Sequence, residues 1–165
     1  MANMYLVCGL PGSGKTTFAK ELADRNNYQY FSPDFYYAYI NGSELDRSNK
    51  FDAWIMMFCD IQEAMENNED CVVDTAAITY AQRQEFLNWF PDFEHHLIWI
   101  DADIFQCLKN NESRKRVIPL ERMEKYFDDF EEPDEEEDER WLTFTHIENV
   151  CNEMQLSGIY VKVGN

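Results

Sequence analysis

Short apolar runs alternate along the chain with longer segments in which apolar residues recur at helical spacing. Continuous apolar or aromatic runs, typical of buried parallel strands, occupy 5–8, 28–31, 71–73 and 97–100, and alternating segments typical of strands follow at 141–147 and 159–163. Helical periodicity covers 15–25, 51–65, 80–89, 104–111 and 120–130. This alternation predicts an α/β fold of three layers, in which a parallel sheet has helices on both faces.

The longest predicted helix carries one apolar face along its length. That face comprises Phe51, Trp54, Ile55, Phe58, Ile61 and Met65. A stripe at this spacing is expected to pack into the core. No internal repeat and no linker-like stretch interrupts the chain, so we expect one domain over residues 1–165.

The strongest chemical signal lies where the first predicted strand gives way to the first predicted helix. Residues 9–16, with the sequence GLPGSGKT, fit the phosphate-binding pattern GxxxxGK(S/T) at every fixed position. Glycines allow the tight turn that aims backbone N–H groups at phosphate oxygens, and the helix N-terminus adds partial positive charge. In this arrangement Lys15 reaches the β- and γ-phosphates and the Thr16 hydroxyl ligates Mg²⁺. We expect ATP to be bound by Gly12, Ser13, Gly14, Lys15, Thr16 and Thr17.

The rest of the chain separates kinases from other phosphate-loop proteins. Residues 49–52 spell the guanine-reading pattern NKxD, but they precede the strand 71–73 instead of following it, and the chain has no DxxG. At 165 residues the chain also lacks room for the additional elements of a motor ATPase. A compact phosphotransferase remains. It requires a base for the acceptor hydroxyl, a carboxylate near Mg²⁺ and arginines around the transferred phosphate.

Strand ends and one short loop supply candidates for those groups. Asp34 follows the strand 28–31 and is the candidate base, although a carboxylate after Ser-Pro also fits a turn or a helix N-cap. Asp74 closes the strand 71–73 and is the candidate magnesium carboxylate, with a plain strand-end turn as the alternative. Arg114 and Arg116 are alternative lid arginines in a short segment near 111–119, because guanidinium groups pair well with phosphoryl oxygens.

Charge is unevenly distributed along the chain. The formal net charge is −18, but ten of the twelve residues in 128–139 are acidic, and without them 22 acidic and 14 basic residues leave −8. Six of the basic residues fall within 109–125, immediately before that run. We expect the acidic segment 128–139 to be a solvated loop that repels polyanions at long range.

Composition excludes several other classes of protein. No apolar run approaches the ~20 residues of a membrane span, and the chain does not open on a signal-peptide pattern. The five cysteines are odd in number and form no CxxC pair, and the three histidines form no HExxH pattern. We therefore expect a cytoplasmic protein with reduced thiols, without a membrane or zinc as partner.

Four segments taken together resemble one family. The sequences GLPGSGKTT, SPDFYY, VVDTAAIT and NNESRKRVIP, at 9–17, 32–37, 72–79 and 110–119, are similar to those of the 5′-hydroxyl polynucleotide kinase branch of the AAA-type P-loop kinases. The resemblance covers about residues 4–133. It implies ATP and Mg²⁺ as cofactors, Asp34 as catalytic base and Arg114 as lid arginine. It also places Arg83 near the acceptor, while Tyr37 stands where phage relatives have an arginine.

The acceptor stays open at this point. Phe35, Tyr36, Tyr37 and Tyr39 cluster around Asp34, where aromatic rings either stack on a base or fill the core. The acidic body disfavours long polyanions, whose binding depends on several phosphate contacts. We expect the 5′-OH of a polynucleotide as acceptor, with Asp34, Tyr37 and Arg83 on the acceptor side. The alternatives are a small-molecule or nucleotide kinase and a non-catalytic ATP-binding protein.

Overall fold

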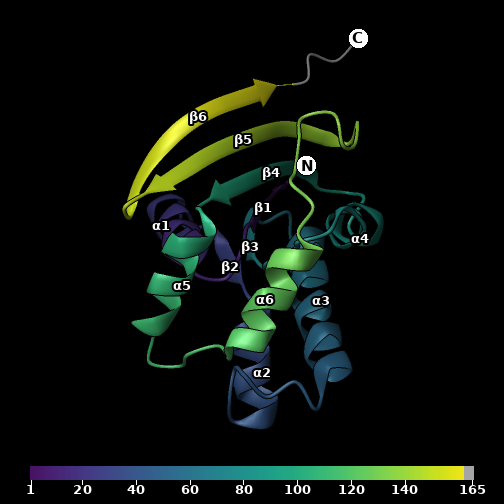
Figure 1. Ribbon diagram of the computed structural model, residues 1–165. Helices are drawn as coiled ribbons and strands as arrows, with labels where there is room; N and C mark the ends of the chain where they lie inside the picture. Colours follow the sequence, from purple (N-terminus) through teal and green to yellow (C-terminus); the bar gives the residue numbers. More distant parts are fainter. Residues whose placement is uncertain (162–165) are drawn as a thin grey trace.

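The computed structural model describes residues 1–161, and the chain forms one six-stranded sheet with helices on both faces (Figure 1). The strands are β1 (Asn3–Cys8), β2 (Gln29–Phe31), β3 (Cys71–Asp74), β4 (Glu94–Asp101), β5 (Trp141–Val150) and β6 (Glu153–Val161). Their order in the sheet is β2-β3-β1-β4-β5-β6. All neighbours are parallel except β5 and β6, which are antiparallel. The predicted three-layer α/β fold is confirmed, with an antiparallel strand added at one edge.

Within the described part of the chain, six helices surround the sheet. They are α1 (Lys15–Asn26), α2 (Pro33–Asn41), α3 (Lys50–Glu66), α4 (Tyr80–Trp89), α5 (Ile104–Glu112) and α6 (Leu120–Asp129). One face of the sheet packs against α1, through residues such as Val7, Ala19 and Ile98. The opposite face packs against α2, α3 and α4, through residues such as Leu6 and Met57. None of the helices within residues 1–161 combines the length and apolar character needed to cross a membrane.

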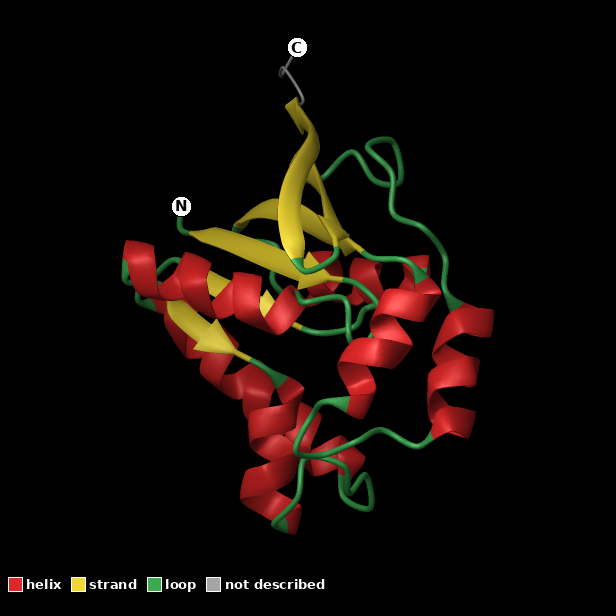
Figure 2. Cartoon of the chain, turned by 60° about the vertical axis from the view of Figure 1, so that its left-hand side comes forward, coloured by secondary structure: helices red, strands yellow, loops and turns green. Residues whose placement is uncertain are grey.

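Two elements differ from the sequence-based expectation. Helix α2 was not predicted, and it forms because Pro33 occupies the first turn and Gly42 ends the helix at φ 75°. The strand expected at 159–163 begins earlier, at Glu153, while residues 162 and 163 lie outside the described part of the chain. Cys151 and Asn152 connect β5 to β6 with φ of 53° and 66°, the left-handed values that a tight hairpin turn requires. Figure 2 shows this hairpin at the edge of the sheet, away from α2 and α3.

The buried face of α3 also differs from the predicted one. Ala53, Met57, Ile61 and Ala64 are the buried residues of this helix. Phe51 is 76% exposed and Ile55 is 45% exposed, so the predicted apolar stripe is rotated relative to the core. Ile61 belongs to both the predicted face and the buried one, and the predicted Trp54, Phe58 and Met65 are partly buried against the core.

The acidic segment is not the detached loop that its composition indicates. Its first two residues belong to α6, and the Glu131 carboxylate accepts a hydrogen bond from the Tyr80 backbone N–H at 2.7 Å. Glu137, whose side chain is only 5% exposed, forms an ion pair at 2.8 Å with Arg83, whose side chain is 1% exposed. A buried guanidinium requires a buried partner, and this requirement holds the acidic segment against α4.

Candidate active site

The phosphate loop connects β1 to α1 as the sequence predicts. Gly12 and Gly14 have φ of 84° and 94°, and a Cβ on Gly12 would collide with the carbonyl of Cys107. Two asparagine side chains form hydrogen bonds with carbonyl groups of the loop. Asn110 Nδ2 donates to the Gly12 carbonyl at 2.8 Å, and Asn149 Nδ2 donates to the Ser13 carbonyl at 2.7 Å. The loop is therefore preorganised by contacts from α5 and β5, which no sequence pattern indicates.

Asp74 lies beside the start of α1, as expected for a magnesium carboxylate. Its Oδ2 accepts hydrogen bonds from Thr16 Oγ1 at 2.7 Å and from the Tyr30 hydroxyl at 2.6 Å. Burial and the adjacent Asp74 carboxylate raise the pKa of Tyr30 well above its usual value, so the phenol remains a donor. Within residues 1–161 no donor reaches the buried Oδ1 of Asp74. An uncompensated carboxylate oxygen next to a threonine hydroxyl suits Mg²⁺, which prefers oxygen ligands.

A cavity of about 930 Å³ opens beside these groups, and more than half of the predicted site residues line it. Among the residues that line it are Lys15, Thr16, Asp34, Tyr37, Asp74 and Arg114. Arg83 does not line it, because its guanidinium is buried against Glu137 and also donates to the Ala77 carbonyl at 2.9 Å. The structure therefore places Arg83 away from the cavity, where its side chain anchors the acidic segment, and its acceptor-side role stays a prediction. Arg116 lies 3.9 Å from Glu44 and is not part of the lining.

Asp34 occupies the first turn of α2 and has a cationic neighbour. Arg47 Nη2 lies 3.5 Å from Asp34 Oδ1, and the Arg47 guanidinium lies 3.7 Å from the centre of the Tyr37 ring. The Tyr37 hydroxyl in turn accepts a hydrogen bond from Trp54 Nε1 at 2.7 Å. Arg47 also donates to the Glu44 carbonyl. These contacts orient a carboxylate whose side chain is 44% exposed toward the cavity.

The aromatic cluster after Asp34 divides between core and surface. Tyr36 and Tyr37 are buried, and the Tyr36 hydroxyl donates to Asp60 at 2.6 Å. Phe35 and Tyr39 are exposed and stack on each other with ring centres 6.4 Å apart. Of these four aromatic residues, Tyr37 lines the cavity.

Several residues of the cavity could not be identified from the sequence. The lining includes six of the chain's 14 lysines and arginines but only five of its 32 acidic residues. The basic residues that the sequence did not assign to the site are Arg47, Lys50, Arg122 and Lys125. The aromatic ones are Phe51, Trp54, Phe58, Phe86, Trp89 and Tyr126. The only advance signal is the cluster of basic residues within 109–125, which includes Arg122 and Lys125.

The parallel sheet, the glycine-rich loop at a strand–helix junction, and the carboxylate beside Thr16 define the class of P-loop phosphotransferases. A family model described as an AAA domain matches residues 4–133. The chain belongs to this family, and it has the fold of the ATP-binding P-loop kinases.

Solved structures agree with this assignment at the level of the fold. A gluconokinase from Sinorhizobium meliloti 1021 superposes with a TM-score of 0.62 at 16% identity, covering 88% of this chain and 82% of that chain. A chain of the Pnkp1/Rnl/Hen1 RNA repair complex gives a TM-score of 0.70 at 16% identity, covering 78% of this chain but 43% of that chain. Chaetomium thermophilum Kti12 in complex with ADP-AlF3 gives 0.64 at 17% identity, covering 87% of each.

Proposed function

We propose that this protein transfers the γ-phosphoryl group of ATP to the 5′-hydroxyl of a polynucleotide. The observation that carries the proposal is the composition of the 930 Å³ cavity, where cationic and aromatic side chains surround Asp34 and the phosphate loop. Phosphodiesters require cations, and bases stack on aromatic rings. A cavity that supplies both beside a candidate base fits a nucleic-acid end.

Five of the predicted residues have a role in this transfer. Lys15 binds the phosphates that lie on the loop, and Arg114 stabilises the negative charge that develops on the transferred phosphoryl group. Thr16 and Asp74 would hold Mg²⁺, which when bound would neutralise part of the phosphate charge. Asp34 accepts the proton of the attacking hydroxyl, and Arg47 holds the Asp34 carboxylate in place at 3.5 Å.

The distribution of charge favours a short end over a long strand. Six basic and five acidic residues line the cavity, a formal charge of +1, whereas the whole chain carries −18. Beyond about one Debye length, ~8 Å at physiological ionic strength, a surface charge is largely screened. We expect the first few nucleotides to be bound at the cavity, and a longer strand to be repelled only where it comes within that distance of the acidic surface.

A small-molecule kinase is the second candidate, and the comparisons supply the observation that favours it. This chain covers 82% of the gluconokinase chain but only 43% of the Pnkp1-containing chain, so the small-molecule enzyme is the better match in length. The cavity also contains Glu44 and Glu85, carboxylates that suit the hydroxyl groups of a polyol.

Transfer from labelled ATP distinguishes the two candidates. The wild-type protein is offered 5′-OH oligonucleotides, nucleosides, nucleotides and sugar acids in parallel, and we expect label on the oligonucleotides. Label on a sugar acid or a nucleoside alone would replace the proposal with the second candidate.

Asp34→Asn tests the base. We expect it to keep ATP affinity and lower kcat by roughly 10²–10⁴, the usual contribution of a general base. Asp46→Asn is the matched control, because Asp46 is an exposed carboxylate of the next loop that does not line the cavity. Equal activities of the two variants would place the base elsewhere.

A further inference from the structure

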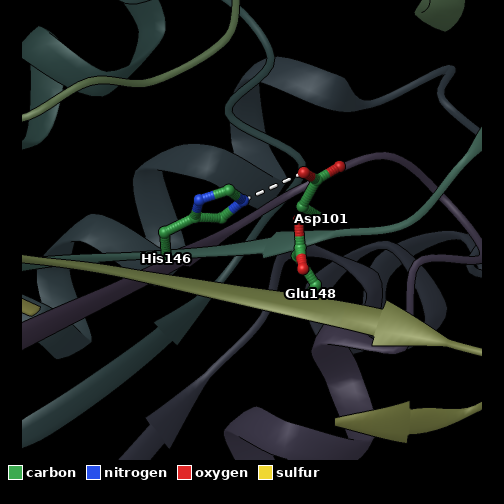
Figure 3. A group of neighbouring side chains, drawn as sticks. All are labelled: Asp101, His146 and Glu148. Carbon is green, nitrogen blue, oxygen red and sulfur yellow. Dashed lines mark hydrogen bonds and ion pairs between the residues drawn. The ribbon is translucent and has the colours of Figure 1, made fainter. Parts of the chain in front are cut away.

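A second group of polar side chains lies at the carboxyl ends of β4 and β5 (Figure 3). Asp101 is the last residue of β4, while His146 and Glu148 lie two positions apart on β5 and therefore on the same face of that strand. One potential ligand atom from each of the three residues lies within 4.8 Å of the other two. None of these residues lines the cavity around Lys15.

The pairing of β4 with β5 places like charges next to each other. Asp101 is the direct register partner of Glu148, and Trp99 is the partner of His146. Neighbouring strands are about 4.8 Å apart, and like charges directly opposite each other on two strands are destabilising. Two facing carboxylates at this position therefore favour a cation between them.

The imidazole of His146 is held in the orientation of a ligand. Its ring stacks on Trp99 with centres 4.3 Å apart and planes at 6°, and its Nε2 lies 2.9 Å from Asp101 Oδ2. Metal–ligand bonds of about 2.1 Å at the tetrahedral angle that Zn²⁺ adopts place two ligand atoms about 3.4 Å apart. Nε2 and Oδ2, which are 2.9 Å apart, would therefore separate by about 0.5 Å to bind the ion.

We propose that Asp101, His146 and Glu148 form a binding site for a divalent transition-metal ion of the Zn²⁺ type. One imidazole nitrogen and two carboxylate oxygens suit such an ion, whereas Mg²⁺ prefers an all-oxygen shell. Glu148 is exposed, so its side chain is free to rotate the remaining distance toward the ion. Binding replaces the proton on Nε2 by the metal, and water completes the coordination.

The position of the site gives it a structural role. Gly9 of the phosphate loop packs against the Ile100 carbonyl, one residue before Asp101. Asn149, one residue after Glu148, donates to the Ser13 carbonyl of the same loop. An ion that joins Asp101 to Glu148 therefore joins the two strands that support the phosphate loop.

Imidazole NMR tests the proposal site by site, because the chain has three histidines. His95 and His96 are buried and hydrogen-bonded to the Phe90 carbonyl and to Thr143 and Asn3, so they serve as internal references. The protein is ¹⁵N-labelled and free of ATP. It carries Cys59→Ser and Cys151→Ser, because these two exposed thiols would also bind zinc. Zn²⁺ is titrated in the presence of millimolar Mg²⁺.

We expect one equivalent of Zn²⁺ to shift the Nε2 resonance of His146 and to leave those of His95 and His96 in place. Mg²⁺ alone is expected to shift none of them. In equilibrium dialysis, Glu148→Gln is expected to weaken Zn²⁺ binding at least tenfold, as loss of a ligand does. Glu153→Gln removes an exposed carboxylate outside the cluster and should bind like the parent.

Three results would overturn the site. They are an unmoved His146 resonance at saturating Zn²⁺, an equal response to Mg²⁺, and equal affinities of the Glu148 and Glu153 variants. Because Glu148 is exposed, its variant is not expected to unfold the protein, and the His95 and His96 resonances report on the fold in every sample. The test uses no phosphoryl transfer, so its outcome is independent of the proposed function.

Discussion

The buried ion pair between Arg83 and Glu137 predicts a large effect from one substitution within the acidic segment. Glu137→Gln removes the charge that balances a guanidinium whose side chain is 1% exposed. The wild-type carboxylate accepts from Arg83 Nε at 2.9 Å and from Nη2 at 2.8 Å. Breaking a buried pair by removing one partner costs about 3–5 kcal/mol, because the remaining charge stays desolvated.

This loss is large compared with the ~5–15 kcal/mol that stabilises a typical domain. With a urea m-value of about 2 kcal/mol/M, the midpoint of unfolding should fall by about 1.5–2.5 M. Circular dichroism in a urea series measures that midpoint. Glu136→Gln is the matched control, because Glu136 is the adjacent exposed carboxylate and its loss changes the net charge equally. We expect the control to lie within about 0.5 kcal/mol of wild type.

Equal midpoints for the two variants would refute the reasoning and restore the picture of a solvated loop. A double variant, Arg83→Met with Glu137→Leu, provides a second check. Replacing both members of a buried pair by apolar groups of similar volume is often neutral or stabilising. The double variant should therefore recover most of the stability that Glu137→Gln loses.

Three further predictions concern the phosphate loop, the lid and the core. Lys15→Ala should abolish ATP binding in isothermal titration without changing the circular dichroism spectrum, and unchanged affinity would remove the phosphate-loop assignment. Arg114→Lys should lower kcat by a larger factor than it changes the KM for ATP, whereas Arg116→Lys should change neither constant. The reverse pattern would move the lid role to Arg116. Burial lowers the pKa of His95 to about 4, and its Nδ1 has no partner within residues 1–161. As the pH falls below about 6.5, the His95 imidazole therefore becomes protonated in the unfolded chain but stays neutral in the native chain. The free energy of unfolding should fall between pH 6.5 and 4 by about 1.4 kcal/mol per pH unit. Urea unfolding at pH 7 and 5 should show a smaller decrease for His95→Gln, and an equal decrease would assign the loss to other groups.

Much of the fold follows from local patterns in the sequence. Apolar runs such as 71–73 predict parallel strands because a strand buried on both faces has no polar side. The helix 80–89 is predicted at its observed bounds, and Thr79 with Gln82 forms the capping box that starts it. The phosphate loop is also local, since one strand, the six connecting positions 9–14 with three glycines, and one helix suffice to specify it.

The elements that were not predicted depend on contacts between distant residues. The acidic segment reads as solvated from its composition, but the buried Arg83, 54 positions from Glu137, attracts one of its carboxylates. The predicted apolar stripe of α3 reads as core, but of its residues Ile61 is fully buried while Phe51 and Ile55 are exposed, and Ala53 and Met57 occupy the core beside Ile61. Hydrophobic periodicity shows that a helix has an apolar side, and the packing of its neighbours decides which residues of that side are buried.

The sequence by itself determined the α/β class, the phosphate loop with Lys15 and Thr16, and the placement of Asp74 at a strand end. Each of these is specified by residues adjacent in the chain, where spacing fixes geometry. Only the tertiary structure decided that Arg47 approaches Asp34, that Arg83 pairs with Glu137, and that Asp101 meets His146. These pairs join residues 13, 54 and 45 positions apart. Their proximity follows from strand order and helix packing, which no local pattern of residues encodes.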